Sequence, residues 1–137
     1  MKVVNILLVD DDYVDAMDIK RNLDKTQILY KLDIKKNGEE AVQFLEDSSK
    51  TTQTSLPDVV LVDINMPRMN GIEFLGAVRG NPKWQHLKCF MVTTSGELVD
   101  KQAVKQLGVS GYIEKPLKLT NPTSMDGFNL MIDLMNA

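Results

Sequence analysis

The chain has little of several features that would point to a particular class of protein. It has one cysteine in 137 residues, so Cys89 cannot form an internal disulfide. This cysteine stands in the apolar run 89–92, where we expect a buried strand residue rather than a nucleophile. The apolar segment 3–9 is too short to span a bilayer, and no small-residue cleavage site follows it. We therefore expect a cytoplasmic protein without a membrane anchor.

Aromatic residues are also sparse, and positive charge is not clustered. Phe, Trp and Tyr make up 6% of the chain, and the net charge is −3 with Lys and Arg scattered singly. A basic stripe or an aromatic stacking platform is therefore absent, and direct binding of nucleic acid is not expected. The length is that of one ordinary domain. We expect residues 1–137 to form a single domain with no separate output domain.

Short apolar runs alternate with segments of helical period along the whole chain. We expect strands at 3–9, 29–34, 58–62, 87–92 and 111–114, each followed by a helix. Asp12 is placed to cap the first helix, a polar loop is expected at 48–55, and a linker up to Thr123 precedes the last helix. This alternation is typical of βα units and predicts an α/β, doubly wound, five-stranded parallel sheet.

Acidic residues directly follow two of the predicted strands. Asp10, Asp11 and Asp12 follow the run 6–9, and Asp63 follows the run 59–62. The carboxyl ends of neighbouring parallel strands meet at one edge of a sheet, so several carboxylates would crowd together there and favour a cation. Carboxylate oxygen is a hard ligand, which favours Mg²⁺. Asp10 and Asp11 are the preferred pair and Asp12 the helix cap, but a strand one residue longer would make Asp11 and Asp12 the pair.

A hydroxyl and an ammonium group are expected at the same edge. Thr93 follows the fourth predicted strand, and Lys115 follows the fifth. Together with a metal held by carboxylates, these groups are suited to holding a dianionic phosphoryl group. The carboxylate of Asp63 is the natural nucleophile, because it can attack phosphorus once a cation offsets the negative charge.

These motifs, in this order, resemble the receiver domain of two-component response regulators. The resemblance rests on the acidic pair in 8–11, the phosphoacceptor strand and loop in 57–67, the turn 69–71, the threonine region 91–94 and the lysine motif 111–116. It covers nearly the whole chain. It implies a flavodoxin-like sheet with strand order 2-1-3-4-5.

The resemblance also implies a role for each site residue. Asp63 would accept a phosphoryl group from a sensor histidine kinase, and Mg²⁺, which Mn²⁺ can replace, would be held by Asp11, Asp63 and the backbone carbonyl of Asn65, with Asp10 acting through water. Lys115 would pair with the phosphoryl group. Thr93 and Tyr112 would be the switch residues, and the Lys115–Pro116 bond is expected to be cis.

Three expectations concern partners and kinetics. The resemblance implies that the face made by the fourth helix, the fifth strand and the last helix binds a downstream protein or a second copy of the chain. Leu130 and Leu134 lie on another side of the last helix than its predicted core residues, which leaves an apolar face for such a partner. The family usually has Ala or Gly where this chain has Thr94. We expect this larger side chain to restrict water access and slow self-dephosphorylation.

Two other functions are consistent with parts of the sequence. Asp10 and Asp12 match the Asp-x-Asp start of haloacid-dehalogenase-type phosphatases, as nucleophile and general acid. In that family the later acidic motif follows the lysine, whereas Asp63 precedes Lys115 here, and the chain has no room for a cap domain. A receiver-like module that binds partners without phosphorylation is the third option, and the full set of site residues disfavours it.

Overall fold

The computed structural model of this chain describes residues 3–26, 28–50, 56–64, 66, 68–94, 101–115 and 122–135. Some side chains within these ranges, including those of Thr94 and Lys115, lie outside the described part. The strands are β1 (Val4–Val9), β2 (Tyr30–Lys35), β3 (Val59–Asp63), β4 (Lys88–Thr94) and β5 (Gly111–Lys115). The helices are α1 (Tyr13–Asp24), α2 (Gly38–Ser49), α3 (Gly71–Arg79), α4 (Lys101–Gln106) and α5 (Pro122–Met135).

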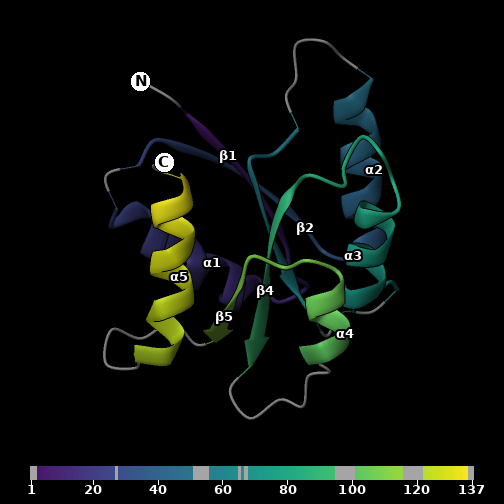
Figure 1. Ribbon diagram of the computed structural model, residues 1–137. Helices are drawn as coiled ribbons and strands as arrows, with labels where there is room; N and C mark the ends of the chain where they lie inside the picture. The colour runs from purple at the N-terminus through teal and green to yellow at the C-terminus, as the bar shows by residue number, and fades with distance from the viewer. Residues whose placement is uncertain are drawn as a thin grey trace.

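The strands form one parallel sheet in the order β2-β1-β3-β4-β5, which confirms the predicted fold class and strand order. Helices α1 and α5 cover one face of the sheet, and α2, α3 and α4 cover the other (Figure 1). None of the helices in the described part of the chain is long and apolar enough to cross a bilayer.

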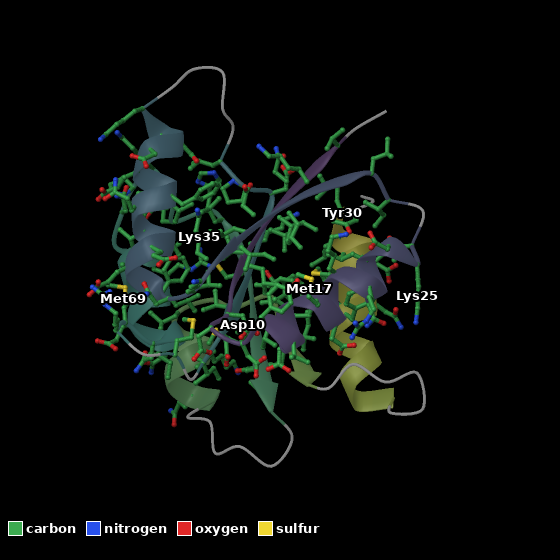
Figure 2. All side chains as sticks on the ribbon, turned by 180° about the vertical axis from the view of Figure 1, so that it is seen from behind. Asp10, Met17, Lys25, Tyr30, Lys35 and Met69 are labelled. Atoms are coloured by element: carbon green, nitrogen blue, oxygen red, sulfur yellow. The ribbon has the colours of Figure 1, made fainter. Side chains whose placement is uncertain are left out.

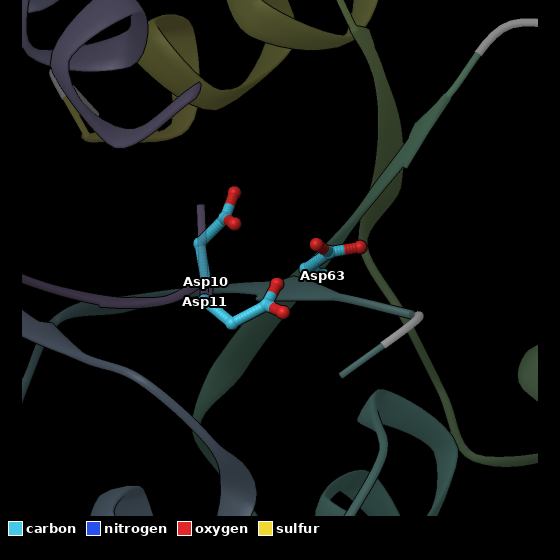
Figure 3. Close-up of side chains that lie close together, drawn as sticks. All are labelled: Asp10, Asp11 and Asp63. Carbon is cyan, nitrogen blue, oxygen red and sulfur yellow. The ribbon is translucent and has the colours of Figure 1, made fainter. Parts of the chain in front are cut away.

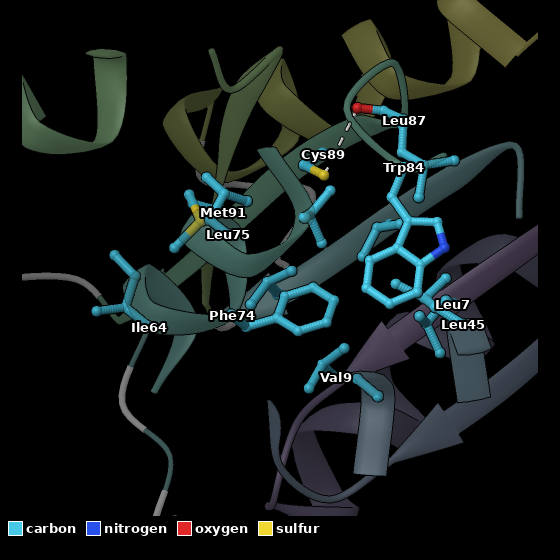
Figure 4. Close-up of a cluster of buried hydrophobic side chains, with 14 of the residues drawn as sticks. Leu7, Val9, Leu45, Ile64, Phe74, Leu75, Trp84, Leu87, Cys89 and Met91 are labelled. Atoms are coloured by element: carbon cyan, nitrogen blue, oxygen red, sulfur yellow. Dashed lines mark hydrogen bonds between the residues drawn. The ribbon is translucent and has the colours of Figure 1, made fainter. Parts of the chain in front are cut away.

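The central strands are buried on both faces, and their side chains alternate between two hydrophobic clusters. Along β1, Leu7 and Val9 join the cluster under α2 and α3, while Ile6 and Leu8 join the cluster under α1 and α5. Figure 4 shows the first cluster, in which Phe74 packs among the strand residues. Each fully buried side chain of this size contributes about 1.5–3 kcal/mol by leaving water, so this burial fixes β1 and β3 at the centre of the sheet.

Several predicted boundaries were wrong by one or two residues. Strand β3 begins and ends one residue later than predicted, β4 runs from 88 to 94 rather than 87 to 92, and β5 includes Lys115. The apolar runs end earlier than the strands because backbone hydrogen bonds continue past them; the N–H of Ile64 still donates to the carbonyl of Val92 at 3.3 Å. Asp63 and Thr93 are therefore strand residues.

Two predicted loops were also too long. Ser48 and Ser49 belong to α2, because Ser48 is buried and the hydroxyl of Ser49 donates to the carbonyl of Leu45 at 2.8 Å; residues 51–55 of that loop lie outside the described residues. Helix α5 starts at Pro122, inside the expected linker. Proline is common at the first helical position because its missing N–H would have no partner there.

Two side chains hold the segment between α3 and β4. The indole N–H of Trp84, which is 3% exposed, donates to the hydroxyl of Ser49 at 3.0 Å, so this tryptophan packs in the core. The guanidinium of Arg79 donates to four backbone carbonyls at 2.6–3.0 Å, those of Gln85, Leu87, Leu107 and Gly108. Arg79 thus joins this segment to the turn after α4, where Gly108 has the positive φ of 71° expected of a helix-terminating glycine.

Cys89 is a strand residue of the core, as expected. It is fully buried in β4, and its thiol donates to the carbonyl of Leu87 at 3.7 Å (Figure 4). Burial raises the pKa of this thiol to about 11. Because the thiolate is the reactive form, this cysteine is a packing residue.

Candidate functional site

The pairing of β1 with β3 decides which side chains meet at the carboxyl edge of the sheet. Val9 lies opposite Val62 in the parallel register, so Asp10, directly after β1, and Asp63, the last residue of β3, lie side by side at this edge. Both are buried, at 2% and 5% exposure, although neither is apolar. Polar groups at such positions are the usual ligand-binding residues of doubly wound sheets.

Three carboxylates form a cluster at this edge. One oxygen each from Asp10, Asp11 and Asp63 lies within 4.8 Å of the other two (Figure 3). At this separation two unit charges near a protein surface repel by about 3 kcal/mol, so a divalent cation would stabilise the cluster. Asp11 is exposed and open to solvent, whereas the other two are enclosed. The donor set fits a hard cation such as Mg²⁺ or Mn²⁺.

The register of the acidic triplet follows from hydrogen bonds at the start of α1. Asp12 caps this helix, and its carboxylate accepts the N–H groups of Val14 and Asp15 at 2.8 and 3.2 Å. The N–H of Asp12 in turn donates to Oδ1 of Asp10 at 2.9 Å, which fixes the orientation of the Asp10 carboxylate. The structure therefore places Asp10 and Asp11 beside Asp63. The alternative pair of Asp11 and Asp12 does not form the cluster.

The chain after Asp63 turns back closely on itself. The N–H of Gly71 donates to the carbonyl of Ile64 at 3.0 Å, which closes the loop before α3. A Cβ atom at residue 71 would lie 2.4 Å from the carbonyl oxygen of Asp63, so this position requires glycine. Asn65 lies outside the described residues, and its expected carbonyl ligand is not placed.

Asn70, in the turn 69–71, has a local role at the start of α3. Its side chain accepts the N–H of Glu73 at 2.9 Å, and the Glu73 carboxylate accepts the N–H of Asn70 at 3.1 Å. This reciprocal pair is a capping box at the start of α3. Asparagine serves as well as aspartate in this position.

The expected switch residues lie on the neighbouring strands. Because Asp63 pairs with Val92 in the sheet, Thr93 extends one residue further along the same edge and is half-buried. Tyr112 on β5 pairs with Met91, is partly buried, and has a pKa raised by desolvation, so its hydroxyl is protonated at neutral pH. The backbone of Lys115 pairs with Thr94 at this edge. The side chains of Thr94 and Lys115, and the Lys115–Pro116 bond, lie outside the described residues.

Sequence reasoning missed the support that α2 gives to this site. The contact between Gly38, at the start of α2, and Met69, more than thirty residues away, was not expected. The N–H of Gly38 donates to the carbonyl of Met69 at 3.2 Å. The only available signal was the glycine itself, which marks a position where another part of the backbone can approach closely.

Comparisons with known proteins all identify the same family. The sequence pattern of the response regulator receiver domain matches residues 6–126. The chain is similar to response regulator Rcp1 of Synechocystis, with 30% identity over 114 residues that cover 83% of this chain and 78% of that protein. Among solved structures, the Mn²⁺-bound form of response regulator Rcp1 has a TM-score of 0.80 and 27% identity, covering 98% of this chain and 96% of that one. The bacteriophytochrome response regulator AtBRR has a TM-score of 0.77 and 27% identity, covering 99% and 92%.

We expect Mg²⁺ to stabilise the fold through the carboxylate cluster. At a concentration one hundred times its dissociation constant, a ligand of the folded state raises the free energy of unfolding by about 2.7 kcal/mol. Thermal denaturation with and without Mg²⁺ measures this effect. The increase should be much smaller in Asp63→Asn, while Asp133→Asn, an exposed change on α5, should keep it in full. An equal increase in all three proteins would contradict metal binding at the cluster.

Proposed function

Because the chain belongs to the response regulator receiver domain family, we propose that it is a phosphorylation switch in which Asp63 accepts a phosphoryl group from a sensor histidine kinase. Members of this family are signalling proteins rather than classical enzymes. The observation that carries the proposal is the cluster of Asp10, Asp11 and Asp63 at the carboxyl edge of the sheet. It combines a nucleophilic carboxylate with neighbours that can hold a divalent cation.

The proposed metal is Mg²⁺, with Mn²⁺ able to replace it. Asp11 and Asp63 would bind it directly together with the carbonyl of Asn65, and Asp10 would act through water. The Mn²⁺-bound structure of Rcp1 supports a divalent metal in this family. When bound, the metal supplies positive charge that offsets the approach of an anionic phosphoryl group to an anionic nucleophile.

The proposed transfer forms one bond and breaks one. An oxygen lone pair of Asp63 forms the new P–O bond, while the electron pair of the P–N bond returns to the imidazole of the donor histidine, whose other ring nitrogen carries a proton. The product is an acyl phosphate on Asp63 and a neutral histidine on the kinase. The low exposure of Asp63 limits the water that can reach it, which slows hydrolysis of the acyl phosphate once it has formed.

The conformational readout would start from Thr93, Lys115 and Tyr112. The Lys115 ammonium would bind a phosphoryl oxygen and the Thr93 hydroxyl would donate a hydrogen bond to another. Tyr112 would then turn inward from its partly buried position on β5. A downstream protein would read the resulting change in the face formed by α4, β5 and α5.

The rival phosphatase function receives less support. It requires Asp12 as a general acid, but the Asp12 side chain caps α1 by accepting two backbone N–H groups. This capping role accounts for Asp12 without a catalytic one. Binding without phosphorylation is the other alternative, and the clustering of all three carboxylates favours phosphorylation over it. A cytoplasmic location and the lack of direct contact with nucleic acid remain predictions.

Intact mass after incubation with acetyl phosphate tests the phosphoacceptor. We expect the wild type to gain the mass of one phosphoryl group only when Mg²⁺ is present, and we expect Asp63→Asn to gain none. Asp133→Asn is the control and should behave as the wild type. If neither the wild type nor the control forms an adduct with Mg²⁺ present, binding without phosphorylation becomes the better interpretation. Donor hydrolysis that persists in Asp63→Asn would instead support the phosphatase centred on Asp10.

Replacing Thr94 tests the effect of its size on the phosphate lifetime. In Thr94→Ala, water should reach the acyl phosphate more easily, so the adduct should decay several-fold faster than in the wild type. Mass spectrometry over time after removal of the donor measures the decay. Thr26→Ala is a matched control just after α1, where the Thr26 hydroxyl donates to the carbonyl of Leu23 at 2.7 Å and accepts the N–H of Ile28 at 3.4 Å. An unchanged lifetime in Thr94→Ala would refute the expectation.

The face formed by α4, β5 and α5 is also proposed to pair with a second copy of the chain. Leu130 on α5 is 43% exposed, although it is a large apolar side chain. Leu134, which was expected on the same free face, instead packs against the hydrophobic cluster under α1 and α5. We expect the sedimentation coefficient to rise with protein concentration after phosphorylation, and Leu130→Glu to abolish this rise. Leu29→Glu, at an exposed leucine just before β2, should leave the rise intact. A wild type that stays monomeric with and without phosphate would exclude the dimer.

A further inference from the structure

The loop that follows Asp63 is anchored to the first turn of α2. The N–H of Gly38, the first residue of that helix, donates to the carbonyl of Met69 at 3.2 Å. The first N–H groups of a helix have no partner inside it, so this carbonyl satisfies one of them from outside. Figure 2 shows Met69 beside the end of α2 that lies toward the same edge of the sheet as Asp10.

The backbone of this loop adopts a conformation that needs such support. Arg68 and Met69 have φ angles of 61° and 120°, in the region that non-glycine residues rarely occupy. Backbone of this kind persists where the surrounding structure holds it, and it is found at functional sites. Here the conformation occurs between the proposed phosphoacceptor and the helix that follows it.

Gly38 and Met69 pack closely against each other. A Cβ atom on Gly38 would lie 2.6 Å from Cγ, 2.8 Å from Cβ and 2.8 Å from the carbonyl oxygen of Met69. A side chain at residue 38 would therefore have to displace the Met69 backbone. The Met69 side chain also packs against the hydrophobic cluster under α2 and α3. The neighbouring Glu39–Arg68 ion pair, at 3.0 Å, is exposed on both sides and adds little.

Met69 is linked to Asp63 through Gly71, which contacts the backbone of Ile64 and Asp63. Two residues after Met69, Gly71 donates its N–H to the carbonyl of Ile64, and its Cα packs against the backbone of Asp63 so closely that a Cβ would collide there. The end of the loop at Gly71 therefore contacts the residue that bears the carboxylate. A shift of Met69 would shift this contact.

We propose that Gly38 and Met69 are positioning residues that set the metal affinity of the carboxylate cluster by holding the loop after Asp63. The inference rests on the proposed function, because it takes the cluster to be a metal site. Neither residue would touch the metal or the phosphoryl group. Outer groups that orient metal ligands typically change metal affinity about 10–100-fold when they are removed, so the effect should be measurable.

The test is a Mn²⁺ titration of the unphosphorylated protein, followed by the electron paramagnetic resonance signal of the free ion. We expect Gly38→Ala to raise the dissociation constant about 10-fold. Gly76→Ala is the matched control, since it makes the same change in α3, where a new Cβ would meet nothing within 4 Å. Its dissociation constant should equal that of the wild type. Far-ultraviolet circular dichroism at the titration temperature verifies that each variant is folded.

A second variant keeps the test decisive if Gly38→Ala does not fold. Met69→Ala introduces no collision and removes the side chain that anchors the loop, so it should also weaken Mn²⁺ binding several-fold while the protein stays folded. If the wild type binds Mn²⁺ and a folded variant at either position binds it equally well, the positioning role is refuted while the proposed function stands. If the wild type binds no Mn²⁺, the metal site and the positioning role fail together.

Discussion

The parallel pairing of β1 with β3 is the constraint on which the rest of the structure depends. It brings Asp10 and Asp63 to the same edge, and the burial of both strands on both faces prevents the register from changing. A shift of one residue would turn every side chain of a strand to the opposite cluster. The strands are therefore held by two hydrophobic clusters, each lying under a different set of helices, and the strands in turn hold the three carboxylates close together. The carboxylates repel one another, and a cation can offset this electrostatic cost.

The fold and the outline of the site were predictable because they depend on short-range patterns. Continuous apolar runs mark strands covered on both faces, and the acidic residues that follow these runs are read directly from the sequence. Strand ends were less predictable. Backbone hydrogen bonds carry β3 through Asp63 and β4 through Thr94, and these bonds do not require apolar side chains. Ser49 was misplaced for a related reason, because its hydroxyl bonds within α2 and to a distant indole.

The support around the site could not be predicted because it joins residues far apart in sequence. Nothing in the residue types of Arg68 and Met69 indicates a left-handed backbone, since glycine, asparagine and aspartate are the residues that usually adopt it. The contact between Met69 and Gly38 depends on how α2 and α3 pack on the sheet. Asn70 illustrates the opposite case, since its pairing with Glu73 follows a local pattern that the sequence contains.

Burial of Cys89 has a practical consequence for labelling. The only thiol of the chain is fully enclosed and has a pKa of about 11, so at neutral pH it offers almost no thiolate to an alkylating reagent. A cysteine introduced on the surface would react selectively while the native one stays in place. A spin label or fluorophore can therefore be attached at one chosen position, for example on α5, to follow its local environment without first redesigning the core.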